Sequence, residues 1–282
     1  MRVRILTGIV LVLVLVAVCL FLDTLLFNAV ICAVSGLGVF ELLRAMKLLE
    51  FKDLVVLSMS QALIIPFMRA GYVERLGAPI VLAVTLCYFV LMVKNSGRVE
   101  IGRISSVFMF STLIPLFFSC AVYIRDDFSG DARSGFYLFL ALGAGWLSDT
   151  GAYFVGTFFG RHKMIPSISP KKTWEGTAGG IIFCTAVTLL IGMGTERWLW
   201  GAGISARVDY RLLFFLTPLF SVAGMLGDLT ASAIKREFGI KDYGNLMPGH
   251  GGVLDRFDSV LFTLPAVYTA VRYLEILSVM AD

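Results

Sequence analysis

Long apolar runs separated by short charged segments dominate the chain and indicate its elements. About 20 apolar residues cross the roughly 30 Å hydrocarbon layer of a bilayer as a helix. The runs are too long for the alternating segments of about 10 residues that a β-barrel uses, and helices satisfy their own backbone groups in lipid. We therefore predict an all-α, polytopic transmembrane bundle of about nine helices, over residues 5–22, 25–43, 54–68, 77–93, 104–124, 134–159, 176–193, 212–234 and 259–274.

Composition agrees with this class, because 58% of the 282 residues are apolar and only 16% are charged. The first run has the basic start of a signal peptide, but no small-residue cleavage site follows it. We therefore expect it to remain as a helix. The lipid bilayer is an expected partner, and nucleic acid is not.

The distribution of positive charge predicts the orientation in the membrane. If the loops alternate between the two sides of nine spans, 16 of the 24 Lys and Arg residues fall on the side of the N-terminus and 8 on the other. Positive charge favours the cytoplasmic side. We expect the N-terminus and loops 160–175 and 235–257 in the cytoplasm, the C-terminus outside, and the protein in the cell (inner) membrane.

Polar residues divide the chain unequally. Residues 1–133 have few polar groups inside their runs and are predicted to be scaffold helices, whereas 134–282 are predicted to be the catalytic region. The five cysteines lie far apart within predicted spans, and the chain has two histidines. This pattern makes a zinc site of His and Cys ligands improbable.

The stretch "GWLSDTGAYFVG" places Asp149 inside a predicted span. An aspartate at the bilayer centre costs roughly 2.5–3.5 kcal/mol on insertion scales, so we expect it to face a cavity. The alternative is a structural hydrogen bond to a neighbouring helix through Ser148 or Thr150. Gly156 and Gly160, spaced as G-x-x-x-G, indicate close helix packing.

The stretch "GRHKMIPSISPKKTWEGT" resembles a helix start, with Ser169 as the N-cap and Pro170 in the first turn. Lys171, Lys172 and Thr173 would then lie at a helix N-terminus, which attracts anions, and could bind phosphate. The alternative is a basic loop beside the membrane that fixes topology or touches anionic headgroups.

The eighth span leads into a polar, glycine-rich stretch. Asp228, Ser232 and Lys235 share one face of a helix, which we expect to end near Gly239. The glycines that follow let the backbone approach a ligand closely. Asp255 and Asp258, three residues apart, open the ninth span on one side.

Asp228, Asp255 and Asp258 could therefore converge at the membrane boundary. Carboxylate oxygens suit Mg²⁺, which binds through one or two carboxylates and substrate phosphates. Nearby cations suit phosphate transfer, which depends on positioning and charge stabilisation. The alternative is a set of salt bridges that orders a loop. The cations are Lys235, Arg236, Lys241 and Arg256.

These motifs resemble the signature of the phosphatidate cytidylyltransferases, the CDP-diacylglycerol synthases. "SDTGAY" and "SPKKTWEG" are similar to upstream family segments, so the resemblance covers about residues 145–260; Met247 stands where the family usually has Ile, Leu or Phe. The signature positions are Ser232-x-Ile234-Lys235-Arg236, Lys241-Asp242-x-Gly244, Pro248-x-His250-Gly251-Gly252 and Asp255-Arg256-x-Asp258.

The resemblance implies a Mg²⁺-dependent membrane enzyme of phospholipid biosynthesis that joins CTP to phosphatidic acid and releases pyrophosphate and CDP-diacylglycerol. It also implies a homodimer, and it leaves open a second, monovalent cation. The expected metal ligands are Asp228, Asp255 and Asp258; Lys235, Arg236 and His250 complete the catalytic set. Substrate binding is expected from Lys171, Lys172, Thr173, Ser232, Lys241, Asp242, Gly251, Gly252, Arg256 and Asp149.

Two other functions remain open at this point. A CTP-dependent polyprenol or phytol kinase would share the metal and nucleotide site but would need a base for its alcohol substrate. A cation transporter could use Asp149 and Asp228 as ion sites within the membrane. A transporter has no need of the glycine-rich loop or the lysine pair, and should show no effect specific to CTP.

Overall fold

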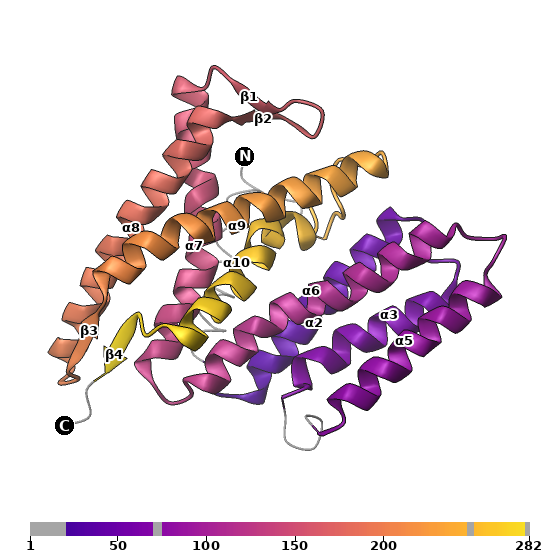
Figure 1. The fold of residues 1–282 in the computed structure, drawn as a ribbon, viewed down its shortest axis with the longest axis horizontal. Coiled ribbons are helices and arrows are strands. Elements are labelled where there is room, and N and C mark those ends of the chain that lie inside the picture. The colour runs from indigo at the N-terminus through magenta and orange to yellow at the C-terminus, as the bar shows by residue number, and fades with distance from the viewer. Residues whose placement is uncertain (1–20, 70–74, 247–250, 280–282) are drawn as a thin grey trace. The chain divides into compact units, whose positions relative to one another are not determined.

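The structure of the protein is a computed structural model that describes residues 21–69, 75–246 and 251–279. Its chain forms two compact units. Unit 1 is Met1–Tyr123 with Phe238–Arg256, and unit 2 is Ile124–Glu237 with Phe257–Asp282. The elements, labelled in Figure 1, are α2 (Leu25–Ala45), α3 (Lys52–Ile64), a 3₁₀ turn η1 (Ile65–Phe67), α5 (Gly77–Lys94), α6 (Ile101–Asp127), α7 (Ala132–Phe159), β1 (Lys163–Ile165), β2 (Ser169–Thr173), α8 (Trp174–Gly201), β3 (Ala206–Val208), α9 (Tyr210–Glu237), α10 (Leu254–Tyr273) and β4 (Leu277–Val279).

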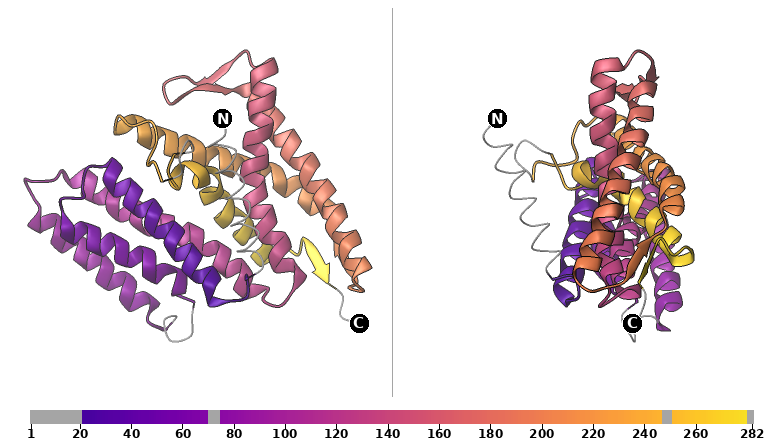
Figure 2. Two further views of the ribbon diagram at one scale, coloured as in Figure 1. Left: turned by 180° about the vertical axis from the view of Figure 1, so that it is seen from behind. Right: turned by 90° about the vertical axis from the view of Figure 1, so that its left-hand side faces the viewer.

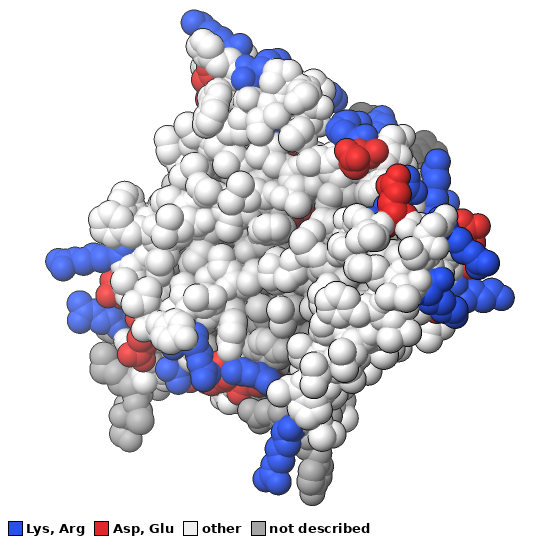
Figure 3. Space-filling model, turned by 45° about the vertical axis from the view of Figure 1, so that its right-hand side comes forward, with Lys and Arg blue, Asp and Glu red and all other residues white. Residues whose placement is uncertain are grey.

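The prediction of an all-α membrane protein is confirmed. Within the described residues, α2, α5, α6, α7, α8 and α9 are long and apolar enough to cross a membrane, which makes six candidate spans. The face shown in Figure 3 is broad and mostly uncharged, as expected of helices in contact with lipid. The predicted number of nine spans is not confirmed. Most of span 5–22 lies outside the described residues, and α3 has only 13 residues.

Unit 1 contains α2, α3 and α5 with most of α6, and these helices lie side by side in Figures 1 and 2. A buried hydrogen-bond network joins three of them. The Tyr88 hydroxyl in α5 lies 2.9 Å from Ser58 Oγ and donates to Gln61 Oε1 at 2.9 Å, both in α3, and it lies 2.8 Å from Ser111 Oγ in α6. The scaffold helices therefore contain more polar structure than the sequence led us to expect.

In unit 2, α7 and α8 pack closely along their length, as the views in Figures 1 and 2 agree. Small residues make this approach possible. A β-carbon added at Gly180 would lie 2.5 Å from the carbonyl oxygen of Ser148, and one at Gly176 would lie 3.0 Å from Gly156 Cα. The expectation that Gly156 marks close helix packing is confirmed.

The segment that joins α7 to α8 is a β-hairpin, in which β1 and β2 pair antiparallel. The expected helix start at Ser169 and Pro170 is therefore wrong. Both residues lie in β2, where a short edge strand tolerates proline. The helix begins only at Trp174, because Thr173 is its N-cap and accepts a hydrogen bond from the Gly176 N–H at 3.1 Å. The strands β3 and β4 form a second antiparallel pair.

Candidate active site

Glycines allow three helices of unit 2 to meet with almost no space between their backbones. A β-carbon added at Gly227 of α9 would lie 2.3 Å from the carbonyl oxygen of Asp258 in α10. One added at Gly224 of α9 would lie 3.4 Å from Gly145 Cα in α7. One added at Gly145 would lie 3.0 Å from Ser259 Oγ in α10. The helices α7, α9 and α10 therefore cross at these small residues.

This crossing gathers three aspartates, each half-buried. Asp228 follows Gly227 directly in α9, Asp149 lies one turn beyond Gly145 in α7, and Asp258 lies beside the contact in α10. The negative charge of Asp228 acts on both Asp149 and Asp258, and that of Asp149 also acts on Asp258. Three like charges in a partly buried place repel one another, so the cluster favours cations.

The hairpin supplies the first cation. Lys172 of β2 forms an ion pair with Asp228 of α9, and the two side chains are 20% and 24% exposed. The hairpin is also tied to the end of α9, because Arg236 Nε donates to the Ile168 carbonyl at 3.2 Å. Lys235 of α9 acts electrostatically on Asp258. Four elements, α7, β2, α9 and α10, thus contribute to one acid–lysine cluster: Asp149, Lys172, Asp228, Lys235 and Asp258.

The two residues beside Lys172 on the N-terminal and C-terminal sides differ in exposure. Thr173 is buried and caps α8, so its oxygen is occupied by a backbone N–H. Lys171 is exposed on β2.

Ser232 of α9 is half-buried one turn after Asp228 on the same helix, as the spacing predicted.

The remaining predicted residues belong to unit 1, where they lie in the loop before α10 and in the first turn of that helix. Asp255 Oδ2 accepts hydrogen bonds from the N–H groups of Tyr243 at 2.7 Å and Gly252 at 3.0 Å. Gly251 has a φ of +85°, which a residue with a side chain adopts only with strain. His250 lies outside the described residues. Three further predicted residues, Lys241, Asp242 and Arg256, are exposed.

Sequence reasoning missed one residue of this loop's environment. Glu41 of α2 is buried, and its carboxylate accepts hydrogen bonds from Val253 and Leu254. A signal was available, because Glu41 is an acidic residue inside the predicted span 25–43, two residues before its end.

The chemistry of the acid–lysine cluster fits Mg²⁺. Among the described residues, no group of three or more His, Cys, Asp or Glu side chains is placed so that it could hold a metal ion. Mg²⁺ does not need one, because it keeps water and usually binds one or two carboxylates together with substrate phosphates. Lys172 already places a positive charge on Asp228. The carboxylates of Asp228 and Asp258 are of the chemical kind that Mg²⁺ binds together with substrate phosphates.

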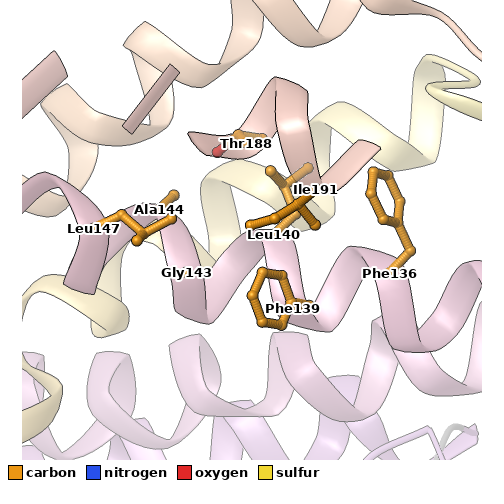
Figure 4. A pocket seen from close by; sticks show the side chains of 8 residues that line it. All are labelled: Phe136, Phe139, Leu140, Gly143, Ala144, Leu147, Thr188 and Ile191. Carbon is orange, nitrogen blue, oxygen red and sulfur yellow. The ribbon is translucent and has the colours of Figure 1, made fainter. Parts of the chain in front are cut away.

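A pocket between α7 and α8 is unsuited to phosphate chemistry. Figure 4 shows its lining, whose side chains are apolar except for the hydroxyl of Thr188. Such a lining offers no charge to a nucleotide. It is formed by Phe136, Phe139, Leu140, Gly143, Ala144, Leu147, Thr188 and Ile191.

Comparison with known proteins identifies the family. The model of the cytidylyltransferase family matches residues 2–274. A protein of Bacillus subtilis (strain 168) named phosphatidate cytidylyltransferase is 34% identical over 276 residues, which are 95% of this chain and 96% of the relative. Proteins of the same name from Staphylococcus saprophyticus and Staphylococcus epidermidis are 45% and 42% identical over 46% and 51% of each chain. Because the family model covers nearly the whole sequence, the chain belongs to the cytidylyltransferase family.

Proposed function

We propose that the protein is a phosphatidate cytidylyltransferase that converts CTP and phosphatidate into CDP-diacylglycerol and pyrophosphate. The observation that carries the proposal is the ion pair between Lys172 and Asp228 within a group of three aspartates. Transfer of a nucleotidyl group between two phosphate-bearing substrates requires carboxylates that bind a metal and lysines that bind phosphates. The name of the relatives supports the choice of substrates.

We propose that Asp228 and Asp258 bind Mg²⁺. When bound, the metal neutralises the negative charge of the triphosphate and of the leaving pyrophosphate. Asp149 adds negative charge beside these two residues and so favours the cation. The expectation that Asp255 is a further ligand stays a prediction, as does a monovalent cation beside Mg²⁺.

In the proposed reaction an oxygen of the phosphatidate phosphate attacks the α-phosphorus of CTP. A new oxygen–phosphorus bond forms, the bond between the α-phosphorus and the bridging oxygen breaks, and pyrophosphate leaves with the electron pair. Lys172 and Lys235 hold phosphate oxygens and balance their charge. The nucleophile is already an anion, so the residues need not remove a proton from it.

The proposed substrates agree with the proposed orientation. Phosphatidate lies in the bilayer, whereas CTP is soluble, so the cluster belongs at the cytoplasmic boundary with the N-terminus on the same side. The excess of Lys and Arg in the alternate loops supports this orientation. A homodimer stays a prediction from the family resemblance.

The function is tested by the products that the purified full-length protein makes in detergent. With CTP and phosphatidate present, we expect equal amounts of pyrophosphate and CDP-diacylglycerol, and neither product when one substrate is omitted. Removing divalent metal with a chelator should stop the reaction, and added Mg²⁺ should restore it. Formation of CDP and a phosphorylated lipid alcohol would instead indicate a kinase, and no CTP-dependent product would contradict an enzyme of either kind.

Lys172→Ala is expected to lower the rate roughly 10- to 100-fold and to raise the KM for one substrate. A hydrogen bond to a charged group contributes about 1.5–3 kcal/mol, and about 1.4 kcal/mol corresponds to a factor of ten in rate. The loss should be graded, because Mg²⁺ still neutralises Asp228 without the lysine. Steady-state kinetics in detergent measure both constants.

Lys94→Ala is the matched control, because Lys94 forms an ion pair with Asp53 on the exposed surface of unit 1. Exposed pairs contribute only about 0–1 kcal/mol, so this variant should react at the normal rate. Normal kinetics for Lys172→Ala would show that the lysine only fixes topology.

A further inference from the structure

A buried acid in α2 caps a helix that begins 213 residues later in the chain. Glu41 is 5% exposed, and its two oxygens are both used: Oε1 accepts from the Val253 N–H at 2.9 Å, and Oε2 accepts from the Leu254 N–H at 3.0 Å. Leu254 is the first residue of α10. The first N–H groups of a helix have no partner within it, and a negative charge there is favourable. Val253 directly precedes the helix, but its apolar side chain has no acceptor. Glu41 therefore accepts hydrogen bonds from these N–H groups instead.

The same carboxylate explains two glycines of the loop before α10. A β-carbon added at Gly252 would lie 2.4 Å from Glu41 Oε1 and 2.5 Å from Oε2. One added at Gly244 would lie 2.5 Å from Oε1. All three distances are shorter than any ordinary contact, so the backbone can approach Glu41 this closely only with glycine at these positions.

A second acid binds the loop from its other side. Asp255 accepts from the N–H groups of Tyr243 and Gly252, whereas Glu41 accepts from the two residues that follow Gly252. Four backbone N–H groups between Tyr243 and Leu254 are thus held by two carboxylates. The two carboxylates thus hold the backbone at Tyr243 and at the start of α10, whose first turn carries Asp255.

We propose that Glu41 is a positioning residue for the reaction: it holds Val253 and Leu254 at the start of α10, and so sets the placement of Asp255 in the first turn of that helix. The proposal rests on the proposed cytidylyltransferase function. Glu41 acts through the backbone of Val253 and Leu254 and does not itself contact substrate. A carboxylate suits this role because it offers an acceptor to each N–H, whereas an amide would offer one acceptor and set its NH₂ group against the second N–H.

The test compares Glu41→Gln with Glu50→Gln in the full-length protein. Glu50 is exposed just beyond α2 and is the matched control. We expect Glu41→Gln to lower kcat roughly 10- to 100-fold, because one charge-assisted hydrogen bond is lost and one N–H is left without an acceptor. Amide hydrogen exchange measured by mass spectrometry should become at least about tenfold faster in a peptide covering residues 251–256, with exchange in α3 and α5 unchanged. The control should match the wild type in both measurements.

A second variant keeps the proposal testable if Glu41→Gln folds poorly. Gly252→Ala forces a methyl group into the Glu41 carboxylate, so we expect it to lower kcat in the wild-type background. In a Glu41→Ala background the clash is absent, and Gly252→Ala should then have little further effect. Such non-additivity measures the coupling between the two positions. Effects that multiply independently would contradict the proposed contact.

The outcomes separate this proposal from the proposed function. Faster exchange at residues 251–256 with an unchanged kcat would show that Glu41 only stabilises the fold and would overturn the positioning role. Unchanged exchange and unchanged kcat would overturn the cap as well. If the wild type itself makes no pyrophosphate from CTP and phosphatidate, the proposed function fails, and with it the positioning role, whereas the exchange data still decide whether Glu41 caps α10.

Discussion

Replacing Asp228 by asparagine is expected to abolish pyrophosphate release from CTP and phosphatidate while the protein still folds and inserts. A neutral amide binds Mg²⁺ poorly, and in this variant Lys172 also loses its ionic partner. Mutation of a residue that only orients a metal ligand lowers metal affinity or activity about 10- to 100-fold. We therefore expect the loss of a ligand itself to lower the rate by more than about 100-fold. The measurement is the rate of pyrophosphate release at ordinary and at raised Mg²⁺. The same result is predicted for Asp255→Asn.

Asp53→Asn is the matched control, because it breaks the exposed ion pair with Lys94 in unit 1. It should leave both the rate and the amount of folded protein unchanged. Turnover of Asp228→Asn like that of the wild type at ordinary Mg²⁺ would remove Asp228 from the site.

Gly227→Ala is expected to have the largest effect on stability, a loss of about 3 kcal/mol, at the upper end of what overpacking costs. The added methyl group would lie 2.3 Å from the carbonyl oxygen of Asp258, and neither backbone can move aside as a flexible side chain could. The variant should also lose activity, because relief of the clash moves Asp258 away from Asp228. Thermal unfolding in detergent and the pyrophosphate assay measure the two effects.

Gly194→Ala tests whether the effect comes from the contact and not from the loss of a helical glycine. Gly194 lies within α8, and a β-carbon there would have no heavy atom within 4 Å. Alanine in an exposed helix position is favoured over glycine by about 1 kcal/mol, so this variant should be as stable as the wild type or more so. A loss of stability in Gly194→Ala equal to that in Gly227→Ala would contradict the close crossing of α9 and α10.

The sequence predicted those features that depend on local pattern. Apolar length gave the helical class, and a charge inside an apolar run singled out Asp149. Helical spacing placed Asp228, Ser232 and Lys235 on α9, which ends at Glu237, two residues before Gly239 with its φ of +65°. Each of these predictions depends only on the types of a few neighbouring residues and on the free-energy cost of placing polar groups in lipid.

Features that depend on tertiary contacts were not predictable in this way. Ser169 and Pro170 have the residue types of a helix start, but pairing with β1 keeps them extended, and Thr173 then serves as the cap. The spacing of Asp255 and Asp258 predicted that both lie on one side at the start of the last helix, without showing that Asp255 binds loop amides. Glu41 contacts residues more than 200 positions away, so no local pattern could reveal its partners.

The most direct test of the proposed metal and phosphate site is a binding titration with Mn²⁺ in place of Mg²⁺. Electron paramagnetic resonance monitors the binding. The signal of free Mn²⁺ falls as the ion binds, so the titration reports affinity without any turnover. We predict that Asp228→Asn and Asp258→Asn each weaken Mn²⁺ binding at least about tenfold, whereas Asp53→Asn binds Mn²⁺ as the wild type does. Lys172→Ala should bind Mn²⁺ at least as tightly as the wild type, because the lysine ammonium that competes for Asp228 is absent. Wild-type affinity in both Asp228→Asn and Asp258→Asn would contradict a metal site at the crossing of α7, α9 and α10.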